Sequence, residues 1–215
     1  YRQMPELIEA GNLYIAQPPL YRAKKGNSEV YLKDDRAMED HLIDGGLSEA
    51  VLTTQVGGQV AGEDLRSLVF EARDIKSSLQ KMSRSFPTHI VEQVAVSGAF
   101  NPEVLSDKDT AVAAAQYIAK RLDHLESEYE KGWSGDAAEE GGLCFTRTLR
   151  GVTETHVLDA PTLNSSEGRY LDSLAAELQE VYTHPSTLTV KEKEVKISGP
   201  VSLIEGVLAE GKRGT

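Results

Sequence analysis

The clearest periodicity in the chain is a run of hydrophobic residues spaced alternately three and four positions apart. Such spacing places the side chains along one stripe of an α-helix, and it continues through about three heptads before Pro87 ends it. We predict a long helix that packs against another helix; a dimeric coiled coil is the second interpretation of the same pattern. The stripe consists of Leu65, Leu68, Ala72, Ile75, Leu79, Met82 and Phe86.

A second amphipathic segment begins after Ser106 and is predicted to form the antiparallel partner of the first long helix. Ser106 and Asp109 have the spacing of a capping box, in which each side chain binds the backbone amide of the other residue. Gly132 is predicted to end this helix, and the acidic, glycine-rich residues 132–142 are predicted to form a loop. The hydrophobic positions are Val112, Ala115, Ile118, Leu122, Leu125 and Tyr129.

The start of the chain alternates between short hydrophobic runs and turn residues. Residues 2–10 predict a helix, and residues 13–15 predict a buried strand that ends at two prolines. A β-hairpin is predicted next, with its arms at residues 20–23 and 30–33 and a glycine-containing turn between them.

A short helix is predicted to follow this hairpin. Asp34 or Asp35 can cap its first turn, and Gly45 and Gly46 are predicted to end it just beyond residue 43. We place the boundary between two structural units at this glycine pair.

The last third of the chain mixes predicted hairpins with predicted helices. The hairpin arms are residues 143–149 with 153–158 and residues 187–190 with 195–198, and the helices are residues 167–182 and 200–210. The predicted fold class is therefore α+β, with small antiparallel sheet elements, surrounding helices and a long helical hairpin.

The composition is that of an ordinary globular domain. Of the 215 residues, 40% are hydrophobic and 27% are charged, so we expect a packed core. No stretch approaches the ~20 apolar residues that cross a bilayer, and there is no signal-peptide pattern. The single cysteine, Cys144, cannot form an internal disulfide, which fits a reducing compartment. We expect a cytoplasmic location and no membrane partner.

The charge is distributed unevenly along the chain. Residues 1–36 carry six basic and five acidic side chains, a net charge of +1, whereas the whole chain has a net charge of −11. The remaining residues therefore carry −12. Because phosphate contacts need clustered lysine and arginine, this acidic part is a poor surface for nucleic acid. Any contact with DNA is expected to be local and near the start of the chain.

The residue types that usually carry catalysis form no recognisable constellation. The five histidines lack metal-ligand spacing, and motifs such as HExxH, CxxC and GxSxG are absent. Cys144 lies in a predicted strand and is interpreted as a small core residue. The neighbouring Asp34 and Asp35 offer the alternative of a metal-dependent nuclease, although helix capping explains them more simply. We predict no catalytic residue, no metal ligand and no cofactor in this chain.

Basic residues on the first predicted hairpin give the best binding signal. Arg22 and Lys24 alternate on one arm and so share a face, with Tyr21 and Tyr31 as aromatic neighbours. A solvated hairpin face is the alternative interpretation. The candidate DNA-binding residues are Arg22, Lys24, Lys25 and Lys33. Two weaker pairs, interpreted as ordinary surface charge, are Arg147 with Arg150 and Lys191 with Lys193.

Three stretches near the start carry a specific resemblance. Residues 1–9 read YRQMPELIE, residues 14–21 read YIAQPPLY and residues 31–36 read YLKDDR. They resemble the B subunits of bacterial DNA gyrase and of topoisomerase IV, and weaker similarity follows in order along the chain. The resemblance implies that residues 1–43 are the C-terminal part of a Toprim domain and residues 44–215 the insertion of Gram-negative gyrases. Because Tyr1 is not a natural translation start, we expect a piece of a longer protein.

The resemblance places no catalytic residue of the family on this sequence. The family's ATPase domain and acidic metal ligands would precede residue 1, and its DNA-cleaving tyrosine belongs to the partner A subunit. The implied function is a non-catalytic contribution to DNA binding and to coupling and assembly in ATP-dependent supercoiling. The implied partners are the gyrase A subunit, double-stranded DNA and the rest of the gyrase B subunit, with Mg²⁺ and ATP belonging to the intact enzyme. A self-associating scaffold built on the heptad stripe is the second alternative, beside the nuclease.

Overall fold

The computed structural model describes residues 5–11, 13–84 and 86–214. Helices and short antiparallel sheets alternate along these residues, which confirms the predicted α+β class. The helices are α1 (Pro5–Glu9), α2 (Asp35–Leu47), α3 (Gly62–Met82), α4 (Thr88–Val96), α5 (Pro102–Ser106), α6 (Lys108–Leu125), α7 (Ala160–Leu163), α8 (Ser166–Ser173), α9 (Ala175–Tyr182) and α10 (Pro200–Arg213). The strands are β1 (Tyr21–Lys25), β2 (Ser28–Leu32), β3 (Ala50–Thr53), β4 (Gln59–Ala61), β5 (Trp133–Ala137), β6 (Gly142–Leu149), β7 (Val152–Asp159), β8 (Ser186–Val190) and β9 (Lys193–Ile197).

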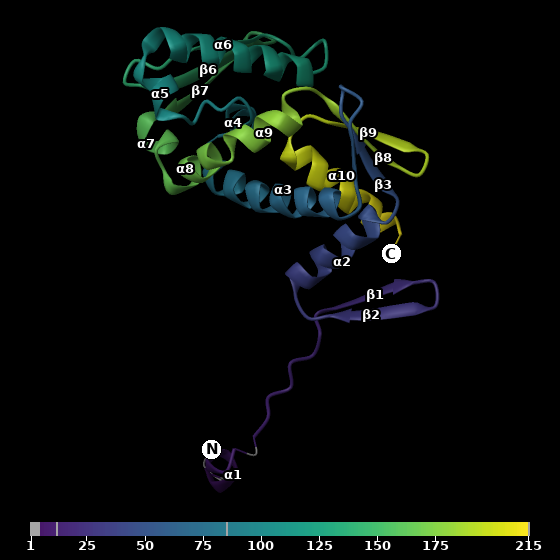
Figure 1. Cartoon of the computed structure of the whole chain (residues 1–215). Coiled ribbons are helices and arrows are strands. Elements are labelled where there is room, and N and C mark those ends of the chain that lie inside the picture. Colours follow the sequence, from purple (N-terminus) through teal and green to yellow (C-terminus); the bar gives the residue numbers. More distant parts are fainter. Residues whose placement is uncertain (1–4, 12, 85, 215) are drawn as a thin grey trace.

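The described start of the chain extends away from the remainder of the molecule. In Figure 1, α1 lies at the end of an extended segment, and the β1–β2 hairpin lies between that segment and α2. The predicted buried strand at residues 13–15 is wrong: this stretch forms no strand, and Tyr14 and Ile15 are 87% and 85% exposed. The predicted start of the first helix lies outside the described residues. The hairpin itself is confirmed, with Tyr21 paired to Leu32 and Lys25 to Ser28.

The body contains two sheets, one of which pairs strands that are far apart in the sequence. One sheet has the order β4-β3-β8-β9, in which β3 pairs antiparallel with β8. The other has the order β5-β6-β7 and lies against α6, at the end of the molecule opposite the β1–β2 hairpin (Figure 1). Both predicted hairpins of the last third are confirmed, as β6–β7 and β8–β9.

Helix α3 buries most of the predicted hydrophobic stripe within the chain itself, while Leu68 is only partly buried and Phe86 lies beyond the end of the helix. It contacts α4, α8 and α10, and its buried residues follow the helical period. Because this stripe is already covered, it is not available as the seam of a dimeric coiled coil. The buried residues of α3 are Leu65, Val69, Ala72, Ile75, Leu79 and Met82.

The two long helices do not form the helical hairpin that the pattern predicts. Helix α4 contacts both α3 and α6 and so lies between them. Its buried residues, which include Glu92 and Gln93, lie on every side of the helix, so α4 must be covered all round, and this favours a central position. Every residue of α4 from Ile90 to Val96 is buried.

Three local predictions about helix and loop boundaries are also wrong. Asp107, not Ser106, caps α6 by accepting hydrogen bonds from the Thr110 amide and hydroxyl, at 2.9 and 2.6 Å, while the Ser106 hydroxyl donates to Glu103 O. The predicted helix 167–182 is divided at Leu174 into α8 and α9. The predicted loop 132–142 contains β5. Gly135 lets this strand approach α6, since a Cβ there would lie 2.1 Å from Ala115 O.

Glycines bring α2 and α10 into close backbone contact. A Cβ at Gly46 would lie 2.2 Å from Val207 O, and a Cβ at Gly211 would lie 2.0 Å from Leu42 O. The prediction that Gly45 and Gly46 end the helix is therefore wrong, because α2 continues through both to Leu47. Glycine weakens an isolated helix, but here it permits an approach that any larger residue would block.

We expect Gly46→Ala to lower the free energy of unfolding by about 1–3 kcal/mol, because the added methyl group would force α2 and α10 apart. Gly45→Ala is the matched control: the nearest atom to its Cβ would be 3.8 Å away, so the better helix propensity of alanine should leave stability equal or up to about 1 kcal/mol higher. Urea unfolding of both variants measures the difference. Equal stabilities would contradict the close contact.

A carboxyl group in the core caps the last helix. Glu92 on α4 is 5% exposed, and its Oε2 accepts a hydrogen bond of 2.9 Å from the Val201 amide in the first turn of α10. Gly199, which precedes that turn, leaves the space: a Cβ there would lie 2.3 Å from Glu92 Oε1. Burial raises the pKa of Glu92 to about 7, although the hydrogen bonds from Val201 and Gln93 act in the opposite direction.

This raised pKa predicts an unusual pH dependence of stability. The folded chain binds the Glu92 proton more tightly than the unfolded chain does, so this contribution is fully present below about pH 4 and is lost as the pH rises through about 7. We expect Glu92→Gln to be more stable than the parent at pH 8 by on the order of 1–3 kcal/mol, and the gain to shrink toward pH 5. Chemical unfolding between pH 5 and 8 measures this, with Glu103→Gln on exposed α5 as the control. A pH-independent difference would contradict the assignment.

Candidate functional site

The β1–β2 hairpin presents two basic side chains on one exposed face. The strand register pairs Arg22 with Tyr31 and Lys24 with Glu29, so these four residues share a face. The Arg22 and Lys24 side chains are 58% and 59% exposed. The prediction that Arg22 and Lys24 point the same way is confirmed, and Tyr31 is their aromatic neighbour.

Tyr21 lies on the other face of the hairpin. Its hydroxyl donates a hydrogen bond to Asp35, and this bond raises the pKa of Tyr21 above its usual value. Asp34 caps α2 by accepting a hydrogen bond of 2.8 Å from the Ala37 amide. The two neighbouring carboxylates are thus held in separate local contacts. Tyr21 does not belong to the basic face as predicted.

The four candidate cations do not form one cluster. Glu29 partly offsets the basic face, because its carboxylate lies 3.9 Å from Arg22 and 3.8 Å from Lys24. Lys25 shares the opposite face with Tyr21 and lies near the end of α10, where a Cβ on Gly214 would be 3.4 Å from Lys25 Nζ. Lys33 is exposed and follows β2 directly. The structure therefore brings Arg22 and Lys24 together and sets Lys25 apart.

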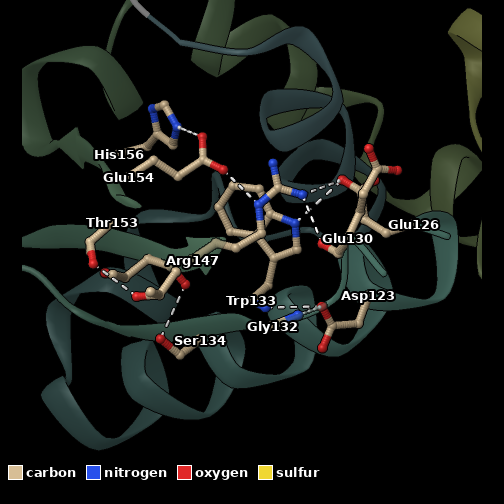
Figure 2. Close-up of polar contacts among 12 residues, drawn as sticks. Asp123, Glu126, Glu130, Gly132, Trp133, Ser134, Arg147, Thr153, Glu154 and His156 are labelled. Atoms are coloured by element: carbon tan, nitrogen blue, oxygen red, sulfur yellow. Dashed lines mark hydrogen bonds and ion pairs between the residues drawn. The ribbon is translucent and has the colours of Figure 1, made fainter. Parts of the chain in front are cut away.

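A second polar cluster joins α6 to the β5-β6-β7 sheet (Figure 2). The Arg147 guanidinium lies 4.5 Å from the centre of the Trp133 ring and donates hydrogen bonds to Glu154 at 2.6 Å and Glu126 at 3.2 Å. It also donates to Glu130 O at 2.9 Å. Only 14% of the Arg147 side chain is exposed. The interpretation of Arg147 as ordinary surface charge is therefore wrong.

Further contacts hold this cluster in place. Asp123 on α6 accepts hydrogen bonds of 2.9 Å from the Gly132 and Trp133 amides (Figure 2). His156 pairs with Glu154 at 3.2 Å. Burial raises the pKa of Glu154, but hydrogen bonds from His156 and Arg147 outweigh this effect and hold the pKa below its usual range. The sequence did not reveal the cluster, since Trp133 faces Arg147 only because β5 forms a strand.

Metal and thiol chemistry have little basis in the described residues. Within them, no group of three or more histidine, cysteine or acidic side chains is placed to hold a metal ion. Cys144 is half-buried, with its Sγ 3.9 Å from the Thr146 hydroxyl, so it is not the core residue that was predicted. None of the described helices is both long enough and apolar enough to span a bilayer.

Comparison with known families identifies the chain. The family model described as the DNA gyrase B subunit insert domain matches residues 50–208. The chain belongs to the DNA gyrase B family. A second model, described as the GyrB hook, matches residues 19–44, which contain the β1–β2 hairpin and most of α2.

Individual relatives agree with this family. The DNA gyrase B subunit of Caulobacter vibrioides is 39% identical over 214 residues, which cover 100% of this chain and 25% of the relative. That of Rickettsia bellii is 34% identical over 215 residues, covering 100% of this chain and 26% of the relative. The type 2 topoisomerase B subunit of Aquifex aeolicus is 36% identical over 91 residues, covering 42% of this chain and 12% of the relative. The chain thus spans about a quarter of the length of the gyrase relatives.

We expect Arg147→Gln to destabilise the fold by about 2–4 kcal/mol, because it leaves Glu126 and Glu154 without their cation in a largely buried setting. Trp133 is the single tryptophan, so its fluorescence reports the change directly. Arg150→Gln, three residues away and exposed, is the matched control and should leave both stability and emission unchanged. An Arg147→Gln variant as stable as this control would show that the cluster contributes nothing.

Proposed function

We propose that this chain is a non-catalytic module of a type II DNA topoisomerase that contacts double-stranded DNA through the β1–β2 hairpin. Its membership of the DNA gyrase B family supports the enzyme class. The observation that carries the DNA contact is the exposed face formed by Arg22, Lys24 and Tyr31 in an otherwise acidic chain. Cations and a tyrosine hydroxyl are groups that bind DNA phosphates without reading base sequence.

The charge distribution supports a contact limited to this hairpin. Residues 1–36 have a net charge of +1, while the whole chain has −11. A phosphate backbone is attracted to the exposed cations and repelled by the acidic remainder. In Figure 1, the hairpin and the β5-β6-β7 sheet lie at opposite ends of the described body. DNA held at the hairpin would therefore lie away from the second sheet.

The connection between hairpin and body supports a coupling role. We propose that residues 1–43 belong to the end of a Toprim domain and residues 44–215 to the gyrase insertion. Helix α2 crosses this boundary and packs backbone to backbone on α10 through Gly46 and Gly211. Because α2 and α10 are packed so closely, they should move together, and a displacement of the hairpin region would be transmitted to the insertion.

The remaining parts of the activity belong to the intact enzyme. In this proposal, the gyrase A subunit supplies the DNA-cleaving tyrosine, and the rest of the gyrase B subunit supplies the ATP site and the Mg²⁺ ligands. The chain contributes to assembly with both partners and to ATP-dependent supercoiling in the cytoplasm. It contributes no catalytic residue of its own.

Charge reversal on the hairpin tests the DNA contact. In the full-length gyrase B protein, replacing Arg22, Lys24, Lys25 and Lys33 with glutamate should weaken binding to a double-stranded DNA fragment by at least about tenfold at low salt. The slope of log K against log salt should fall by about 0.9 for each phosphate that the protein no longer binds. Arg22→Glu with Lys24→Glu should produce most of the effect, because these two share the exposed face.

The matched control is Lys108→Glu with Lys120→Glu, two exposed positions on α6 at the opposite end of the body. This pair makes the same charge change and should leave affinity and salt slope nearly unchanged. If the hairpin variants keep the parent affinity and slope, the hairpin does not contact DNA. If the Arg22/Lys24 pair and the Lys108/Lys120 pair weaken DNA binding equally, the effect comes from the net charge of the protein and not from a contact at the hairpin.

A further inference from the structure

A small pocket with basic walls lies where α6 meets the end of α9 and strand β9. Its volume is about 210 Å³. Three basic side chains line it, Arg121 and His124 from α6 and Lys196 from β9. Leu125, Pro185 and Tyr182 supply apolar surface beside them. This volume is below that of typical drug-sized sites and suits a ligand with one small ring.

Arg121 is held rigidly by neutral partners. Its Nε donates to the Gln93 side-chain oxygen at 2.9 Å, and its terminal nitrogens donate to Tyr182 O at 2.9 Å and Thr183 O at 2.6 Å. Gln93 is fully buried. These partners fix the guanidinium without neutralising it, since none of them carries a charge. This differs from Arg147, whose charge is balanced by two carboxylates.

No carboxylate lines the pocket among the described residues, although acidic residues outnumber basic ones in the chain. The carboxyl group behind the wall is that of Glu92, which accepts a hydrogen bond of 3.4 Å from Gln93. Burial raises the pKa of Glu92 to about 7, so a substantial fraction of this group is neutral at neutral pH. Glu194 lies two residues from Lys196 on the same face of β9 but does not line the pocket. The pocket is therefore locally positive.

We propose that this pocket binds a small organic anion, with its carboxylate or phosphate group against Arg121 and Lys196 and its apolar part against Leu125 and Pro185. Charge-assisted hydrogen bonds supply the recognition, and the apolar wall selects an organic anion over a bare inorganic one. The site lies on the body and is independent of the proposed DNA contact at the β1–β2 hairpin.

Binding of phenyl phosphate to the 215-residue chain tests the site. In a titration followed by ¹H–¹⁵N NMR at low ionic strength, we expect saturable shifts at Thr183, Lys196 and Ser198. Inorganic phosphate, which lacks the apolar part, and phenol, which lacks the charge, should each bind at least about tenfold more weakly. Equal binding of phenol would overturn the proposal of an anion site, and the absence of saturable shifts at these residues would overturn the site itself.

Two substitutions separate the pocket from general charge. Lys196→Gln should weaken phenyl phosphate binding about tenfold, whereas Lys191→Gln makes the same change at the exposed tip of the same hairpin and should have no effect. Equal affinities in these two variants would overturn the proposal.

Discussion

The contact between α2 and α10 is the constraint on which the rest of the arrangement depends. Gly46 and Gly211 allow the two backbones to approach so closely that even a Cβ atom would not fit at either position. Helix α10 in turn packs on α3, β8 and β9, so this contact joins the hairpin-bearing part to the central core. Since the hairpin meets the body mainly through α2, the direction of its basic face is set at this helix crossing.

Two arginines organise the polar interior in different ways. The charge of Arg147 is neutralised by Glu126 and Glu154, and its guanidinium stacks on Trp133. These contacts stabilise the packing of α6 on its sheet. Arg121 is bound by an amide and two carbonyl oxygens, an arrangement that positions a charge without neutralising it. The arrangement of Arg147 suits a structural role at the contact between α6 and the sheet. The arrangement of Arg121 leaves a positive charge that can attract an anionic ligand.

The sequence predicted the elements whose formation depends on local pattern. The hairpins and the amphipathic helices α3 and α6 were recognised, because their periodicity and turn residues are properties of a short segment. It did not predict what depends on distant packing. Strand β5 forms in an acidic, glycine-rich segment because Gly135 accommodates α6. Helix α4 separates the long helices because its residues are buried on every side.

The candidate site follows the same division. That Arg22 and Lys24 share a face was predictable from strand alternation. Lys25 lies on the opposite face because β1 continues through it, beyond the arm predicted at residues 20–23, and the contact of Tyr21 with Asp35 depends on the position of α2. Arg147 was wrongly interpreted as surface charge because its partners lie on β7 and at the end of α6, and the sequence around residue 147 does not indicate them.

The pairing of β3 with β8 has a consequence for how the chain is made. Strand Ala50–Thr53 leaves the ribosome before its partners, since its neighbour Ser186–Val190 and the covering helix Pro200–Arg213 follow well over a hundred residues later. During synthesis, β3 and the apolar stripe of α3 are therefore made before the strand and the helix that cover them. Such distant pairing slows folding and leaves hydrophobic surface exposed in the nascent chain. Chaperones that bind emerging chains would find this segment exposed until its partner elements have been made.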